Sequence, residues 1–303
     1  ANEMHIELAT QKPLTKILFL EIAKEDIKHV SFIYGLFIGK PSNVNRIPID
    51  KYTAIPNGVH YFTYNSEFKQ VFLGDYKINS QTFYFGTDKY GRDLLSRMLH
   101  GIRISLSVGF IAVFLSLFIG IALGLIAGYF RGKIDDIIMW FVNVVWSIPT
   151  LLMVIAITLA LGKGFWQVFV AVGLTMWVEV TRIVRGQVLS IRELEYVEAG
   201  KALAFKPFRI IFKHILPNVI GPVFVISAAN FAAAILIEAG LSFLGIGAQP
   251  PIPSWGGMIK DHYSYIIMDK AYLAVIPGMA IMSLVLSFMI LGNGLRDAFD
   301  VKN

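Results

Sequence analysis

Few side chains in this 303-residue sequence have a type and spacing that suit catalysis. The six histidines show no metal-ligand spacing, and the protease and hydrolase motifs His-Glu-x-x-His and Gly-x-Ser-x-Gly do not occur. The Gly-x4-Gly-Lys-Ser/Thr loop that cradles nucleotide phosphates is also missing, so the chain should not bind ATP by that loop. The absence of cysteine excludes disulfides and Cys-containing zinc sites. We therefore expect no catalytic residue, no metal site and no cofactor.

Polar residues inside long apolar segments are better candidates for function. Charged and amide side chains are costly within a membrane, and they mark a solute pathway or a buried partner. The four candidates are Asn143, Glu179, Asn230 and Glu238. For Glu238, which we expect near the external end of its helix, a structural hydrogen bond between helices is a simpler explanation than substrate contact. Four isolated polar groups do not form a proton relay, which argues against proton-driven transport.

Composition and segment length identify the elements that hold these residues. Hydrophobic residues make up 55% and charged residues 16% of the chain, and the mean hydropathy is +0.62. These values indicate a polytopic membrane protein. Five stretches with little or no charge are expected to span the membrane, since a span needs roughly 20 residues. They are residues 104–130, 137–162, 164–178, 215–237 and 271–295. The third is short and spans only if Glu179 reaches the headgroups or faces protein.

Glycine and proline positions predict how these helices pack. Gly120, Gly124 and Gly128 recur every four residues and form a smooth stripe for close helix packing, which explains them better than a pore-lining role. Proline breaks at membrane depth are tolerated where backbone is buried or lines a water-filled path. The prolines in question are Pro149, Pro217, Pro222 and Pro277.

Residues 182–214 form a loop dense in cations, with seven Lys and Arg residues against three Glu residues. Short loops of this kind stay on the cytoplasmic side of a membrane. Working outward from this loop, residues 131–136 and the C-terminus are also cytoplasmic, and residues 1–102 lie outside. The net charge of +6 therefore reflects membrane topology, and we expect no nucleic-acid partner.

Within that loop, residues 191–205 are predicted to form a short helix, because acidic residues occupy its first turn and alanines favour it. Pro207 ends the helix at Lys206. Gly200 and Ala204 lie four apart and predict a bare face that another surface can approach closely. Docking onto a soluble partner and packing on the chain's own membrane helices are both compatible with this pattern.

The segment 1–84 differs from the rest. Its longest apolar run, at 30–39, is ten residues and too short to span a bilayer. Residues 59–64 and 68–73 favour strands separated by a polar turn. We expect a folded extramembrane segment with some β-structure.

Just after this segment, Thr87 and Asp88 are predicted to cap a helix lying along the outer membrane face. Arg92 and Arg97 would then sit at headgroup level.

Several stretches resemble a known family. Residues 196–217, YVEAGKALAFKPFRIIFKHILP, are similar to the EAA loop of ATP-binding-cassette (ABC) importer permeases. Gly200 stands where that family usually has Ala, and Ala204 where it usually has Gly. The matching residues are Glu198, Ala199, Ile215, Leu216 and Pro217. The flanks resemble the C-type permease of dipeptide and oligopeptide importers, at residues 85–109, 182–200 and 238–259.

The resemblance covers about 85–300 and implies an all-α type I ABC importer transmembrane domain at 85–303. Five spans are visible, and the family leads us to expect a first span ahead of the numbered chain, with 1–84 as an extracytoplasmic segment. It also implies a coupling helix that contacts an ATPase. The implied coupling residues are Tyr196, Glu198, Ala199, Gly200, Lys201, Ala202, Leu203, Ala204 and Phe205. Relatives often carry Asp at the position of Asn143, so an ion pair there is weakened.

The implied function is half of the path of an ATP-driven importer for di- and oligopeptides, in a bacterial inner membrane. Implied partners are a second permease subunit forming a heterodimer, two ATPase subunits, an extracytoplasmic substrate-binding protein and membrane lipid. Nickel importers share these motifs, but the absence of Cys and of deep-membrane His favours peptide. A stand-alone secondary transporter is the remaining alternative, and the lack of an internal repeat argues against it.

Overall fold

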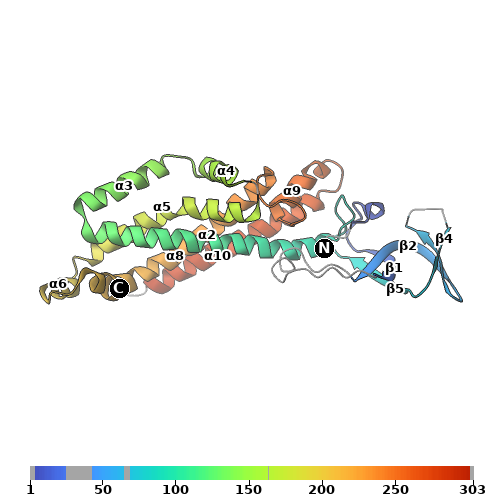
Figure 1. Cartoon of the computed structure of the whole chain (residues 1–303), viewed down its shortest axis with the longest axis horizontal. Coiled ribbons are helices and arrows are strands. Elements are labelled where there is room, and N and C mark those ends of the chain that lie inside the picture. Colours follow the sequence, from blue (N-terminus) through green and yellow to red (C-terminus); the bar gives the residue numbers. More distant parts are fainter. Residues whose placement is uncertain (1–3, 25–42, 65–68, 163, 301–303) are drawn as a thin grey trace. The chain divides into compact units, whose positions relative to one another are not determined.

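The computed structural model describes residues 4–24, 43–64, 69–162 and 164–300 (Figure 1). It divides into two compact units, residues 1–104 with 250–278 and residues 105–249 with 279–303. The boundaries fall inside α2 (Leu94–Phe130) and α10 (Tyr272–Asp300), so each of these helices contributes to both units. The apolar run at 30–39 lies outside the described residues.

The first unit contains a five-stranded antiparallel sheet in the order β4-β3-β2-β1-β5, drawn mainly in blue in Figure 1. Its core includes the buried side chains of Leu20, Ile49 and Val59. The predicted pair of strands at 59–64 and 68–73 is confirmed, because β3 and β4 pair directly. The strands are β1 (Thr15–Ala23), β2 (Val44–Ile55), β3 (Gly58–Thr63), β4 (Lys69–Leu73) and β5 (Lys77–Phe83).

Three short helical elements complete this unit: η1 (Ile6–Leu8), α9 (Trp255–His262) and η3 (Tyr263–Ile266). Trp255 fixes α9 to the start of α2, because its indole N–H donates to the Met98 carbonyl at 3.0 Å. Gly101 makes this approach feasible, since a Cβ there would lie 2.6 Å from the indole ring.

The prediction that Thr87 and Asp88 cap a helix is wrong. Asp88 is fully buried and accepts hydrogen bonds from the Tyr90 and Arg92 backbone and the Arg92 side chain, with Arg97 at 3.4 Å. Both arginines are buried as well, which also contradicts their predicted exposure to lipid headgroups. The helix α2 begins only at Leu94, where Asp93 accepts from the Ser96 backbone N–H at 3.2 Å.

The described residues of the second unit form helices joined by turns, without a strand. Besides its parts of α2 and α10 it contains α3 (Gly132–Trp146), α4 (Thr150–Leu161), α5 (Phe165–Ile191), α6 (Glu195–Ala202), α7 (Pro207–Arg209), η2 (Ile210–Ile215) and α8 (Leu216–Phe243). Among the described residues, four helices are long and apolar enough to cross a membrane. They are Leu94–Phe130, Phe165–Ile191, Pro207–Phe243 and Tyr272–Phe299.

Two of the predicted spans differ in the structure. Residues 137–162 do not form one straight helix, because α3 and α4 meet at an angle of 89°, as in a broken span or a re-entrant loop. Pro149 lies at the break, directly before α4. The stretch predicted as short, 164–178, belongs to a 27-residue helix that continues to Ile191.

The glycine stripe of α2 packs on α5, as predicted. A Cβ at Gly120, Gly124 or Gly128 would lie within 2.7 Å of a side-chain carbon of Val180, Val184 or Val188, respectively. Each glycine of α2 thus packs against one valine of α5, and the valines recur every four residues as the glycines do. Leu125 and these valines form the centre of a buried apolar cluster that continues into α6, η2 and α8.

Candidate functional site

The basic loop at 182–214 consists of the end of α5, followed by α6, α7 and most of η2. Two hydrogen bonds close the C-terminal end of α6. The N–H of Phe205 donates to the Gly200 carbonyl at 3.1 Å, and the N–H of Ala204 donates to the Lys201 carbonyl at 2.9 Å. These two bonds form a Schellman motif, in which the residue after the helix cap adopts a left-handed conformation. Ala204 occupies that position with φ of 54°. The helix therefore ends at Ala202, earlier than the predicted end at Lys206.

The predicted bare face of Gly200 and Ala204 is wrong. Gly200 is buried, and a Cβ there would make ordinary contacts of 3.5 Å with the Phe205 ring and 3.9 Å with Ile210. Ala204 lies beyond the end of the helix, so the two residues do not share a helix face. Val197, which is fully buried, joins Gly200 in attaching α6 to the chain's own helices.

Much of the remaining surface of α6 and of the residues that follow it is exposed. Leu203, the C-cap residue of α6, is 68% exposed, and Phe208 of α7 is 70% exposed with its ring centroid 4.3 Å from that of Phe212. Tyr196 is 43% exposed, and Asn218 Nδ2 donates to its hydroxyl at 3.2 Å. The remaining exposed coupling candidates are Glu198, Ala199, Lys201, Ala202 and Ala204, while Phe205 is half-buried. The loop thus presents large apolar side chains on a charged surface.

Ion pairs and hydrogen bonds join the basic loop to the end of α2 and the start of α3, at residues 129–135. Arg185 donates two hydrogen bonds of 2.6 Å to Asp135, and Arg131 pairs with Glu193 at 2.9 Å. Arg192 also donates to the Tyr129 carbonyl at 2.7 Å. These contacts hold the two turns at the same end of the helical unit, where Figure 1 also shows the end of α10.

Two of the four polar candidates, Asn230 and Glu238, lie buried on α8. The Ser242 hydroxyl donates to Glu238 at 2.6 Å, and Ser242 in turn accepts from the Ala248 N–H at 3.2 Å. This bond lies within one helix, whereas the sequence led us to expect one between helices. Asn230 and Glu238 are about two helical turns apart, and in the described part of the chain they form no common polar cluster with Asn143 and Glu179.

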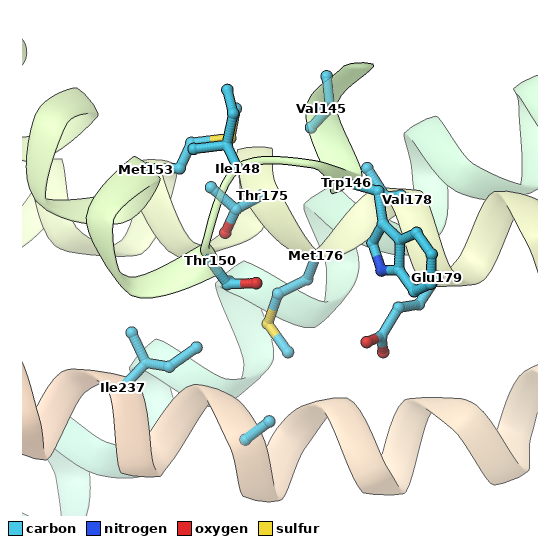
Figure 2. A pocket seen from close by; sticks show the side chains of 11 residues that line it. Val145, Trp146, Ile148, Thr150, Met153, Thr175, Met176, Val178, Glu179 and Ile237 are labelled. Carbon is cyan, nitrogen blue, oxygen red and sulfur yellow. The ribbon is translucent and has the colours of Figure 1, made fainter. Parts of the chain in front are cut away.

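Asn143 and Glu179 lie near the break between α3 and α4. Asn143 accepts a 2.6 Å hydrogen bond from Arg182, whose guanidinium lies 3.8 Å from the centroid of the Trp146 ring. Glu179 lines a cavity of about 190 Å³ between the break, α5 and α8 (Figure 2). The other lining residues are Val145, Trp146, Ile148, Thr150, Met153, Thr175, Met176, Val178, Ala233 and Ile237.

Sequence reasoning missed this cavity and a second polar cluster. In the first unit, Lys89 pairs with Asp261 at 3.0 Å, and the Lys89 N–H donates to His262 at 3.3 Å. The available signal for the cavity is Pro149, since a proline in the interior of an apolar segment kinks or breaks a helix. No comparable signal marks the second cluster, whose members lie more than 170 positions apart in the sequence.

Comparison with known proteins decides the family. Residues 120–301 match the model of the binding-protein-dependent transport system inner membrane component. The dipeptide transport system permease protein DppC of Bacillus subtilis is 43% identical over 223 residues, which cover 74% of this chain and 70% of that protein. This chain belongs to that family of inner membrane permeases.

Two further relatives agree with this membership, and a solved structure has a similar fold. The oligopeptide permease OppC of Bacillus subtilis is 40% identical over 74% of this permease and 73% of its own length. The glutathione permease GsiD of Pectobacterium atrosepticum is also 40% identical and covers 74% of each chain. The inward-facing MetNI methionine ABC transporter has a similar fold, with a TM-score of 0.57 at 18% identity over 68% of this chain and 97% of that chain.

Proposed function

We propose that this permease forms half of the translocation path of an ATP-driven importer for di- and oligopeptides. The observation that carries the proposal is its 40–43% identity, over about three quarters of the chain, to permeases named for dipeptide, oligopeptide and glutathione transport. Glutathione is itself a tripeptide, so all three names denote short peptides. The nickel alternative is not favoured by these relatives.

The proposed contact with an ATPase subunit is α6. Its buried side, with Val197 and Gly200, ties it to η2 and the long helices, so a force on α6 reaches α5 and α8 through packed side chains. Its exposed side carries Leu203 and lies beside Phe208, and clustered exposed apolar groups mark interaction surfaces. Both interpretations of this helix from the sequence, packing on the chain's own helices and docking onto a soluble partner, thus have support, each from different residues. The coupling residues named from the sequence remain a proposal, now centred on the exposed ones.

The proposed topology places residues 182–214 and the C-terminus in the cytoplasm and residues 1–102, with the sheet, outside. The excess of Lys and Arg in the loop supports it, as do the contacts that hold the turn at 131–136 beside the loop. On this basis the partners are a second permease subunit forming a heterodimer, two ATPase subunits and an external substrate-binding protein. The proposed location of this complex is a bacterial inner membrane.

Reconstitution tests the proposed function. Proteoliposomes containing this chain, its second permease and the ATPase subunits, supplied with the binding protein, should accumulate a labelled short peptide only when ATP is hydrolysed. The purified chain alone should move none. Uptake by the chain alone would favour a stand-alone secondary transporter and contradict the proposal.

A further inference from the structure

Glu179 is a carboxylate in an apolar helix, where an ionisable side chain needs water or a complementary group beside it. It lies close to the middle of α5 and is exposed, although its neighbours Val178 and Val180 are buried. In the described part of the chain, no hydrogen bond or ion pair is recorded for it. A carboxylate at membrane depth is tolerated where it faces water or a complementary group. Among the residues that the structure describes, no complementary group pairs with Glu179, so water or a group of another molecule is left to meet it.

Arg182, one turn further along α5, is held by other residues. Its guanidinium donates to Asn143 at 2.6 Å and lies over the Trp146 ring. Because Asn143 is neutral, this arrangement positions the arginine without an acidic partner. Arg182 is therefore held by Asn143 and Trp146 and not by the Glu179 carboxylate, which lines the cavity.

The cavity beside Glu179 has the composition of a site for a small organic cation. Its volume of about 190 Å³ leaves room for a small polar group together with water. Most of the lining is apolar, and two hydroxyls, of Thr150 and Thr175, add polar points. The Thr175 hydroxyl donates to the Val172 carbonyl at 2.8 Å, so its oxygen can still accept. In the view of Figure 2, Met176 lies between the Thr150 hydroxyl and the Glu179 carboxylate.

An ammonium group attached to a short carbon chain matches these features. Its charge complements the carboxylate, its N–H donors suit acceptor oxygens, and its carbon atoms suit Met176 and Trp146. Every peptide with a free N-terminus carries such a group, whose pKa of about 7.7–8.0 leaves it largely charged at neutral pH.

We propose that Glu179 binds the α-ammonium group of the peptide as the peptide crosses this permease. The proposal rests on the function in peptide import proposed above, and it names the residue that recognises a feature common to all peptides of this class. A carboxylate that contacts the peptide backbone terminus, and no particular side chain, allows passage of varied sequences.

Transport by the assembled complex provides the first test. With trialanine at a limiting concentration, Glu179→Gln should lower the initial ATP-driven uptake rate roughly tenfold or more, because a charge-assisted hydrogen bond is lost. Glu179→Asp should retain much of the rate. The matched control Asp136→Asn removes an exposed carboxylate of α3 outside the cavity and should import like the wild type. Wild-type uptake by Glu179→Gln overturns this inference alone, whereas no uptake by the wild type overturns the proposed function.

A cysteine variant separates peptide binding from pairing with the second permease. Because this chain has no native cysteine, Glu179→Cys introduces a single thiol, to be studied with cysteine-free partner subunits. A negatively charged methanethiosulfonate should restore part of the uptake, and its positively charged counterpart should not. Saturating trialanine during turnover should slow modification of the thiol severalfold. A modification rate that is unaffected by peptide shows that Glu179 pairs within the assembly and overturns the proposal.

Discussion

Arg185 of α5 grips Asp135 of α3 with two parallel hydrogen bonds, each 2.6 Å long. The Asp135 side chain is 11% and the Arg185 side chain 29% exposed, so both members of the pair are largely shielded from solvent. This ion pair, called the Asp135 clamp below, joins the end of α5 to the start of α3. The end of α5, which leads into α6, is thereby held in place.

Removing this clamp should destabilise the helical unit. We expect Asp135→Ala to lower the free energy of unfolding by about 2 kcal/mol, because it leaves the Arg185 charge half-buried without its partner. The matched control is Glu193→Ala, whose pair with Arg131 is largely exposed and is expected to contribute less than about 1 kcal/mol. Thermal unfolding of the assembled complex in detergent measures both. Equal shifts for the two variants would contradict a special role for the Asp135 clamp.

The end of α6 offers a prediction with opposite signs at neighbouring alanines. Ala204 has a left-handed conformation that favours glycine, so Ala204→Gly should stabilise the helix end by about 1 kcal/mol. Ala202→Gly, inside the helix, should destabilise it by about 0.5–1 kcal/mol. Hydrogen exchange of the α6 amides in the complex should slow for the first variant and quicken for the second. The same sign for both would contradict the Schellman closure.

The packing of α2 on α5 predicts that single methyl groups are not tolerated in the glycine stripe. A Cβ at Gly124 would lie 2.7 Å from the Val184 Cβ and 2.9 Å from the Thr181 carbonyl oxygen. Gly124→Ala should therefore cost about 1–3 kcal/mol of unfolding free energy. Gly186→Ala, at a helical glycine with nothing within 4 Å, should be neutral or stabilising by up to about 1 kcal/mol. The denaturation midpoints of the two variants test this expectation. A midpoint for Gly124→Ala equal to that of the wild type would contradict the close packing.

Acidification should weaken the first unit through His262. The Lys89 N–H donates to its Nε2, so Nδ1 carries the proton and donates to the Met258 carbonyl at 2.8 Å. Burial lowers the pKa of His262, although Asp88 and Asp261 oppose the shift. The neutral ring therefore stabilises the fold above the unfolded pKa of about 6.5, and this contribution is lost as the pH falls toward the lower folded value.

Unfolding of the first unit measured between pH 7.5 and 5 checks this expectation. The wild type should lose stability over that interval, and His262→Gln should show a smaller loss because its side chain does not titrate. Burial lowers the pKa of Lys89, but its ion pair with Asp261 outweighs burial and raises it, so the Lys89 charge near the ring does not change over this interval. An unchanged slope in His262→Gln would exclude the histidine as the cause.

The long apolar helices follow from composition, but the places where the fold departs from simple periodicity do not. Residues 137–162 carry no charge, so their length predicted one span, while Pro149 sets a bend that hydropathy alone does not measure. The predicted span at 164–178 ended early because the charged residues Glu179, Arg182 and Arg185 follow it. In the structure, Arg182 and Arg185 have partners on α3 and the helix continues.

Long-range pairing accounts for the remaining differences. The strands β3 and β4 are neighbours in sequence and were predicted, whereas β1 pairs with β5 across some sixty residues that no local pattern connects. Asp88 resembles a helix cap in sequence, yet its partners Arg92 and Arg97 enclose it within the first unit. Gly200 suggested an open face because residue size says nothing of the Phe205 ring that covers it.

Cross-linking at Leu203 tests most directly the central claim, that α6 transmits force from an ATPase subunit. Because the chain contains no cysteine, Leu203→Cys places one thiol on the exposed side of α6, and Ile267→Cys places one on the first unit as a control. In the assembled complex, a short bifunctional reagent should join residue 203, and not residue 267, to the ATPase subunit. If residue 203 gives no such product and is labelled from outside intact cells by an impermeant reagent, the account is contradicted.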